Sequence, residues 1–258
     1  MKRGYWYIIL TAVIFSTLEI ALKEVSGSFH PLQMTFTRFL AGGLFLIPFA
    51  VRTLKKKKAS LIWKDLPGFL LLGFVGMVLS MSIYQMSVKE VPASVVAVLF
   101  SSNPIFTAVL AFFMLKEPIR RNQIAALLLE IGGILAIINP FHISLSPYGV
   151  LLAMISTLLF AVYGVMGKRR CARFGGVVVT CASFLCGGAE MLFMILFSRL
   201  PMVNKWLAGS GLELFANIPL LSGYSWNTLP WMLMICIVNT GLGFACYFKA
   251  MERSEERR

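Results

Sequence analysis

Four charged side chains lie well inside long apolar stretches of the sequence, away from their last residues: Glu19, Arg38, Glu130 and Glu190. If lipid surrounds these stretches, each charge costs roughly 3 kcal/mol or more and needs a partner or a function. Glu19 and Arg38 would lie within about 10 Å of the same membrane interface, so we expect them to pair. Alternatively, Glu19 pairs with Lys23 four residues later and Arg38 extends outward. Glu130 and Glu190 could each carry a proton, or could bond to a neighbouring helix as protonated carboxyls.

A polar tetrapeptide, Ser101-Ser102-Asn103-Pro104, lies midway along another apolar stretch. Proline removes a backbone hydrogen bond and frees a carbonyl, which a membrane tolerates only beside protein or a water-filled cavity. We therefore predict a kink that contacts a bound solute, the alternative being a structural kink packed on a neighbouring helix. Asn239 and Thr240 form the polar counterpart in the last apolar stretch. Three aromatic residues are expected to line the same cavity, unless they serve in packing alone: Phe15, Phe160 and Tyr163.

The elements that carry these residues must be membrane-spanning helices. Hydrophobic residues make up 58% of the chain, charged residues only 14%, and the mean hydropathy is +0.80, whereas a soluble chain needs far more charged surface. The net charge of +13 lies in short clusters between the apolar stretches, which is typical of loops beside anionic lipid and not of nucleic-acid binding. Five cysteines, without a CxxC pair or a histidine at ligand spacing, predict free thiols, no metal and no cofactor.

Eight apolar stretches approach the roughly 20 residues that span a bilayer. They cover residues 5–22, 31–51, 66–88, 92–115, 123–138, 148–167, 176–197 and 228–250. With the N-terminus in the cytoplasm, 19 Lys and Arg residues fall on the cytoplasmic side and 4 on the outer side. The positive-inside rule therefore predicts a multi-pass protein of the cell membrane with both termini in the cytoplasm.

The second half of the sequence repeats the first. The spacing Thr-x-x-x-Phe-Leu-x-Gly-Gly begins at Thr35 and again at Thr180, an offset of 145. Pro67 recurs as Pro230, an offset of 163. Equivalent helices are an odd number of spans apart, so the second copy must run upside down in the membrane. The loop charges agree, because residues 24–30 carry no Lys or Arg and their counterparts at 168–173 carry four.

These patterns predict an all-α polytopic membrane protein built from an inverted-topology repeat. The first repeat covers residues 1–141 with five spans, and the second covers residues 145–258 with three. A complete pair of five-span repeats would have ten spans. The second copy therefore stops where its fourth helix should begin. We also expect the pairs Gly42-Gly43, Gly132-Gly133 and Gly187-Gly188 to mark helix contacts.

The order of these motifs resembles the EamA-like family of the drug/metabolite transporter superfamily. The similar features are Arg38 in the second helix, a fourth helix that runs from Pro92 to Glu117, a Gly-Gly-Ile segment at 123–134, and residues 247–252 at the end of the eighth helix. The absence of a ninth and a tenth helix departs from the family pattern. The resemblance implies secondary transport of small metabolites, such as amino acids, across the cytoplasmic membrane, including export, by ion coupling or exchange and by alternating access.

Two other interpretations were compared with a transporter. A membrane-embedded enzyme would need clustered Asp, His or Glu at one interface, or a P-loop, and the sequence contains neither; we therefore expect no enzyme and no catalytic residue. The other alternative is a truncated remnant or a partner subunit without independent transport activity. The expected partners are a small-molecule substrate, the lipid bilayer, a coupling proton and further copies of the chain, with no nucleic acid.

Overall fold

The structure is a computed structural model that describes residues 2–25, 27–116, 118, 121–138 and 145–255. Within these residues the regular structure is helical, and no strand occurs. Two shorter apolar helices, Trp6–Leu22 and Gln123–Ala136, coincide with two of the predicted stretches. Six longer segments match the others and are long and apolar enough to cross a membrane: Pro31–Lys57, Trp63–Glu90, Ala93–Leu115, Pro147–Phe174, Gly176–Ser198 and Leu229–Ala250. The prediction of a polytopic α-helical membrane protein is confirmed.

Packing divides the chain into two compact units. Unit 1 consists of Met1–Met77 and Gly167–Arg258, and unit 2 consists of Val78–Met166. This division follows contacts in space and differs from the repeats predicted from the sequence, 1–141 and 145–258. The boundaries of the repeats therefore stay a prediction.

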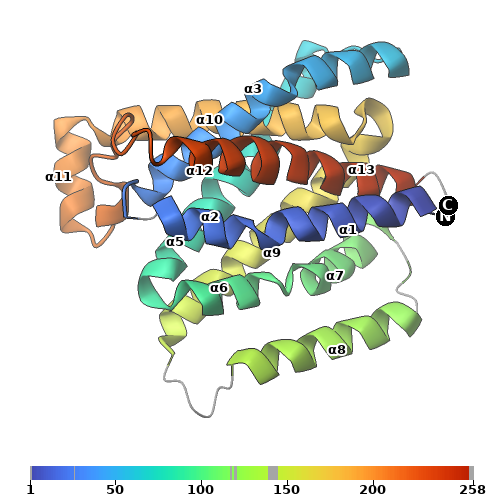
Figure 1. The fold of residues 1–258 in the computed structure, drawn as a ribbon, viewed down its shortest axis with the longest axis horizontal. Coiled ribbons are helices and arrows are strands. Elements are labelled where there is room, and N and C mark those ends of the chain that lie inside the picture. The colour runs from blue at the N-terminus through green and yellow to red at the C-terminus, as the bar shows by residue number, and fades with distance from the viewer. Residues whose placement is uncertain (1, 26, 117, 119–120, 139–144, 256–258) are drawn as a thin grey trace. The chain divides into compact units, whose positions relative to one another are not determined.

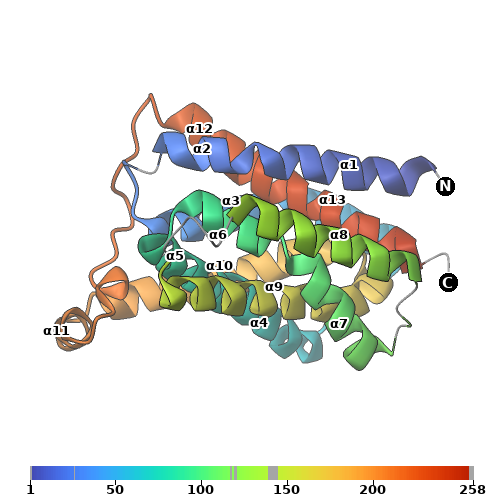
Figure 2. The same cartoon turned by 90° about the horizontal axis from the view of Figure 1, so that it is seen from below.

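Unit 1 contains helices from both ends of the sequence (Figure 1). Figures 1 and 2 show α1 running beside α13, and α3 packs against α10. Its helices are α1 (Lys2–Ser16), α2 (Leu18–Val25), α3 (Pro31–Lys57), η1 (Trp63–Asp65), α4 (Leu66–Gly73), the end of α9 (Pro147–Phe174), α10 (Gly176–Ser198), α11 (Pro201–Gly209), η3 (Glu213–Phe215), α12 (Leu229–Leu233), η4 (Met234–Leu242) and α13 (Gly243–Glu255).

The helices α3 and α10 meet at residues that the sequence repeat makes equivalent. A methyl group added at Gly43 would lie 3.1 Å from Leu185, and one added at Gly188 would lie 3.4 Å from Leu40. At an offset of 145, Gly43 corresponds to Gly188 and Leu40 corresponds to Leu185. The contact is therefore reciprocal. Residue numbers rise along one helix as they fall along the other, so the two helices run antiparallel.

A second reciprocal contact involves the preceding glycines. A methyl group added at Gly42 would lie 3.0 Å from the carbonyl oxygen of Cys236, and one added at Gly187 would lie 3.1 Å from the carbonyl oxygen of Gly73. Gly73 and Cys236 are themselves equivalent at the offset of 163. Small residues allow backbones to approach closely inside a membrane. The expected helix contacts at Gly42-Gly43 and Gly187-Gly188 are thus present.

Two stretches of π-helix occupy equivalent positions in the two halves of the sequence. The first is η2 (Phe74–Ser80), which follows α4, and the second is η4, which follows α12. The offset of 163 places residues 74–80 on residues 237–243, so the two stretches overlap. π-Helix is rare and is frequent at functional sites. Its recurrence at matched positions marks these two spans for closer inspection.

Serine hydroxyls link helices within unit 2. It contains α5 (Met81–Glu90), α6 (Ala93–Phe100), α7 (Asn103–Leu115), α8 (Arg121–Ile138) and most of α9. Ser80 and Ser156 are fully buried, and each hydroxyl donates to the other's carbonyl oxygen over 2.9 Å. Ser87 donates in the same way to the carbonyl oxygen of Gly149, over 2.8 Å. These bonds join the second half of the third span to α9.

The expected helix contact at Gly132-Gly133 in α8 is wrong for the described residues. A methyl group added at either glycine would meet no atom within 4 Å. The neighbouring side chains Leu128, Leu129 and Leu135 are exposed. A helix with an exposed apolar face is expected to face lipid. The two glycines of α8 therefore do not mark a contact with another described helix.

Candidate functional site

Asn239, which was predicted to contact a solute, bridges a break in the first span. α1 ends at Ser16, α2 begins at Leu18, and Thr17 forms a turn between them. The Asn239 amide donates to the carbonyl oxygen of Ile14 over 2.6 Å and to Oγ1 of Thr17 over 2.8 Å. Asn239 is fully buried, and its Oδ1 has no hydrogen-bond partner among the described residues. The break therefore holds a buried acceptor that a donor on a bound solute could satisfy.

Thr240 and Phe15 lie in packed surroundings. Thr240 is buried against α3. Phe15 meets Phe244 edge to face, with ring centroids 5.2 Å apart. Phe39 and Phe184, equivalent at the offset of 145, meet at 4.9 Å, and Phe244 also contacts Phe184 at 5.1 Å. Because the rings fill the space between α1, α3, α10 and α13, this geometry favours the packing alternative for Phe15.

Arg38 is only 7% exposed, and its guanidinium lies 4.7 Å above the ring of Phe39. This burial favours a partner inside the protein over a side chain that extends outward. The Glu19 side chain lies outside the described residues, so the pairing of Glu19 with Arg38 stays a prediction.

The two other acidic residues lie in separate helices. Glu190, in α10, has a buried Oε2 without a hydrogen-bond partner among the described residues. Protonation would relieve the cost of burying a charge there. Glu130 is half-buried in α8. A role in proton coupling stays a prediction for both.

The predicted kink at the polar tetrapeptide is present in unit 2. α6 ends at Phe100 and α7 begins at Asn103, with Ser101 and Ser102 forming the turn. Each serine hydroxyl donates to a carbonyl three residues earlier, over 2.6 Å. Pro104 is exposed in the first turn of α7, and Oδ1 of Asn103 accepts from the next turn of the same helix over 3.3 Å. Among the described contacts, the tetrapeptide makes its hydrogen bonds within its own span.

Aromatic residues line the helix just before this kink. Phe100 packs on Tyr84 and on Phe160, with ring centroids 5.2 and 5.1 Å apart. Phe160 in turn lies 5.6 Å from Tyr163. Both Phe160 and Tyr163 are buried. The predicted aromatic residues of unit 2 therefore form one cluster beside the kink.

The chemistry that these features offer is hydrogen bonding at helix breaks. Among the described residues, no group of three His, Cys, Asp or Glu side chains could hold a metal ion. Broken spans present polar backbone and side-chain groups to a ligand at membrane depth, as discontinuous helices do in secondary transporters. Such groups are able to form hydrogen bonds with a solute.

Sequence reasoning missed the break at Thr17 and both stretches of π-helix. Neither proline nor glycine marks Thr17, and the residue that stabilises its turn, Asn239, lies 222 positions later. The available signal was the polar side chain of Asn239 in an apolar stretch, because a buried amide needs partners. This signal identified Asn239 but not the helix to which its side chain bonds.

Comparison with known proteins identifies a matching family. The model of the EamA-like transporter family matches residues 2–139. An uncharacterized transporter of Clostridium kluyveri is 31% identical over 98% of this chain and 78% of its own length. An uncharacterized transporter of Archaeoglobus fulgidus is 24% identical over 100% of this chain and 83% of its own length. The uncharacterized inner membrane transporter YedA of Escherichia coli is 27% identical over 90% of this chain and 80% of its own length.

A solved crystal structure has the same fold. It superposes with a TM-score of 0.68 at 20% identity, and covers 97% of this chain and 77% of the other. At that identity the match supports the helical arrangement alone.

Proposed function

Because the chain belongs to the EamA-like transporter family, we propose that it moves small metabolites, amino acids or similar solutes, across the cytoplasmic membrane by alternating access. The family and the relatives named as transporters support a transporter over an enzyme. The identity of the solute and the use of a coupling proton belong to the proposal.

The observation that carries the mechanism is the reciprocal packing of equivalent glycines. Gly42 packs on the span of Cys236 while Gly187 packs on the span of Gly73. Two inverted copies that pack in this way can exchange their conformations. The conformation that one copy adopts in the inward-open state can be adopted by the other copy in the outward-open state. Each copy also has its π-helix in the span that receives the glycine of the other copy.

For substrate contact we propose the two broken spans. In unit 1 this is the Oδ1 of Asn239 beside the Thr17 turn, and in unit 2 it is the polar face of Ser101 to Pro104. The support is that each break combines polar side chains with a departure from α-helix. Glu190 is the proposed site of a coupling proton, on the support of its buried and unbonded Oε2.

For orientation we propose that both termini face the cytoplasm. The segment Lys168–Arg173, predicted from the sequence as a loop, forms the last turns of α9. It lies near the basic end of α3 in unit 1, because a methyl group added at Gly175, just after α9, would lie 3.4 Å from Lys57. Lys57→Cys and Arg169→Cys, introduced singly into a chain without its five native cysteines, should react with a membrane-impermeant maleimide only after the cell is permeabilised. Labelling of either one in intact cells would refute the orientation, and labelling on opposite faces would refute the fold.

Transport is tested with the purified chain in proteoliposomes. Radiolabelled amino acids and related metabolites are screened for uptake with and without a pH gradient, and for exchange against the same solute inside. The expected result is saturable uptake of at least one solute, which Asn239→Leu abolishes. Asn227→Leu provides the matched control, because Asn227 is exposed and lies outside the spans.

The variants also separate binding from folding. The loss of transport in Asn239→Leu counts only if the variant is still folded, as shown by a cooperative thermal unfolding transition. A folded chain that transports none of the solutes in either assay would contradict the proposal and favour a partner subunit without independent activity.

A further inference from the structure

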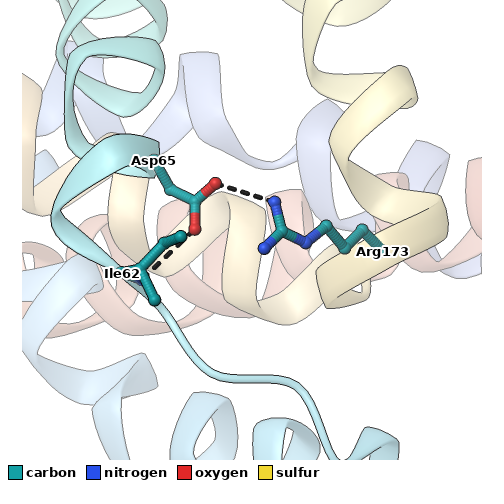
Figure 3. Close-up of polar contacts among 3 residues, drawn as sticks. All are labelled: Ile62, Asp65 and Arg173. Carbon is teal, nitrogen blue, oxygen red and sulfur yellow. Dashed lines mark hydrogen bonds and ion pairs between the residues drawn. The ribbon is translucent and has the colours of Figure 1, made fainter.

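A single carboxylate fixes the loop between the second and third spans of unit 1. The two oxygens of Asp65 accept separate bonds, Oδ2 from the backbone N–H of Ile62 over 3.2 Å and Oδ1 from Nη1 of Arg173 over 2.8 Å (Figure 3). The first bond links Asp65, the last residue of η1, to the residue that precedes η1. The second bond links η1 to the end of α9. The segment from Leu61 to Asp65 is therefore held in one position relative to α9.

This loop forms one wall of an open groove of about 240 Å³. The other wall belongs to α10. The lining residues are mainly apolar: Leu61, Ile62, Trp63, Asp65, Leu66, Phe69, Ala182 and Cys186. Ala182 and Cys186 lie six and ten residues beyond Gly176, where α10 begins, which places them about 9 and 15 Å along the helix. The groove thus extends from the end of the helices into the depth occupied by acyl chains.

The rim of the groove has the character of a membrane interface. Trp63 is 88% exposed, and Leu61 and Ile62 are about half exposed. Tryptophan with exposed apolar neighbours at the ends of spans is typical of the headgroup region, where the indole is apolar on its faces and polar at its N–H. The groove is therefore open toward lipid.

The charge at this rim is positive. Lys64 is exposed and stands between two lining residues, Trp63 and Asp65. The carboxylate of Asp65 is already paired with Arg173, so it does not offset the charge of Lys64. Two further cations lie close to these helices, because the guanidinium of Arg170 contacts Gly68 of α4, and a methyl group added at Gly175, just before α10, would lie 3.4 Å from Lys57. The rim consequently attracts an anion, while the groove below it accepts only apolar groups.

From this combination we infer that the groove binds an anionic phospholipid, with one acyl chain against Phe69, Ala182 and Cys186 and the phosphate beside Lys64. A free phosphate would leave the apolar walls uncovered, and a neutral lipid would offer no net negative charge to Lys64. Basic pockets between spans bind acidic headgroups in this way. The site is independent of the proposed solute path.

Trp63 supplies the test, since it lines the groove. Trp6, Trp206, Trp226 and Trp231 are replaced by Phe, so that the remaining fluorescence reports on Trp63 alone. The protein is reconstituted into vesicles in which brominated acyl chains are carried either by phosphatidylglycerol or, at the same mole fraction, by phosphatidylcholine. Bromine quenches tryptophan at short range. We expect an apparent affinity at least about fivefold higher for phosphatidylglycerol, the factor expected for one basic group at the surface.

Four variants separate a site from diffuse attraction. Lys64→Gln should lower the preference about fivefold, whereas Lys205→Gln on α11 should leave it unchanged. Ala182→Phe fills the groove and should abolish the preference, whereas Leu70→Phe, on an exposed position of α4, should retain it. If Ala182→Phe does not fold, Cys186→Phe fills the same groove from the same helix.

Three results would overturn the inference. Equal quenching by the two brominated lipids would show that the headgroup is not recognised. A preference that persists in a folded, groove-filled variant would show that the cations act without the groove. Displacement of the quenching lipid by inorganic phosphate would assign the rim to a free anion.

Discussion

The close approach of α4 to α10 makes a quantitative prediction about Gly73. A methyl group added there would meet the backbone nitrogen of Gly187 and would lie 2.8 Å from its Cα, whereas ordinary contacts begin at 3.4 Å. Both atoms belong to the backbone and cannot rotate away, so the two helices must move apart by more than about 0.5 Å. Overpacking of this kind costs about 1–3 kcal/mol, and replacing glycine by alanine in a helix returns about 1 kcal/mol. Gly73→Ala should therefore destabilise the protein by up to about 2 kcal/mol.

Two other glycines provide the comparison. At Gly42 the same methyl group would lie 3.0 Å from Cys236 O and 3.3 Å from its other neighbours, so the cost of about 1 kcal/mol and the gain in helix propensity should nearly cancel. At Gly132 it would meet no described atom within 4 Å, and Gly132→Ala should stabilise by up to about 1 kcal/mol. Reversible unfolding in mixed micelles, followed by far-ultraviolet circular dichroism, measures all three. A Gly73→Ala variant as stable as Gly132→Ala would refute the close packing of α4 on α10.

Three further predictions concern side-chain bonds. Asn239→Leu should destabilise the chain by about 1–2 kcal/mol, because it leaves the carbonyl oxygen at the Thr17 turn without the amide; the measurement is the same unfolding assay, and a neutral result would contradict the bridge. Ser80→Ala and Ser156→Ala should each cost about 0.6 kcal/mol, and a double-mutant cycle should show coupling between them if the bonds form a reciprocal pair. Asp65→Asn should cost less than about 1 kcal/mol, since Arg173 is more than half exposed, and a loss that did not shrink at high salt would argue against an ion pair.

Hydropathy and loop charge predicted the spans well because lipid imposes one rule on every residue of a span. Bilayer thickness sets the length, so the stretches that match the helices could be recognised one by one. The same reasoning failed where the outcome depends on a distant part of the chain. Gly42 and Gly132 look alike in sequence, each followed by a second glycine in an apolar helix, yet only Gly42 packs on another helix.

Proline shows the same limit for kinks. Pro104 accompanies a break between α6 and α7, whereas Pro48 lies inside α3, which continues through it. The difference is not in proline itself. At Pro104 the preceding serine hydroxyls bond the carbonyls of the turn, and this supplies an alternative to helical hydrogen bonds. A residue type predicts that a helix can break, and its polar neighbours decide whether it does.

The two reciprocal contacts are equivalent in position but not in tightness. Gly73 meets the backbone of Gly187 at one contact, whereas at the other contact Gly42 meets the backbone of Cys236 and Gly241. An added methyl group would lie 2.8 Å from the Cα of Gly187 at the first contact and 3.0 Å from the nearest backbone atom at Gly42, so the Gly42 contact has less close packing to lose on opening. On the proposed alternating-access mechanism one contact loosens while the other persists, and the two states need not be equally stable. We therefore expect the state in which α4 and α10 stay together to be the more populated one.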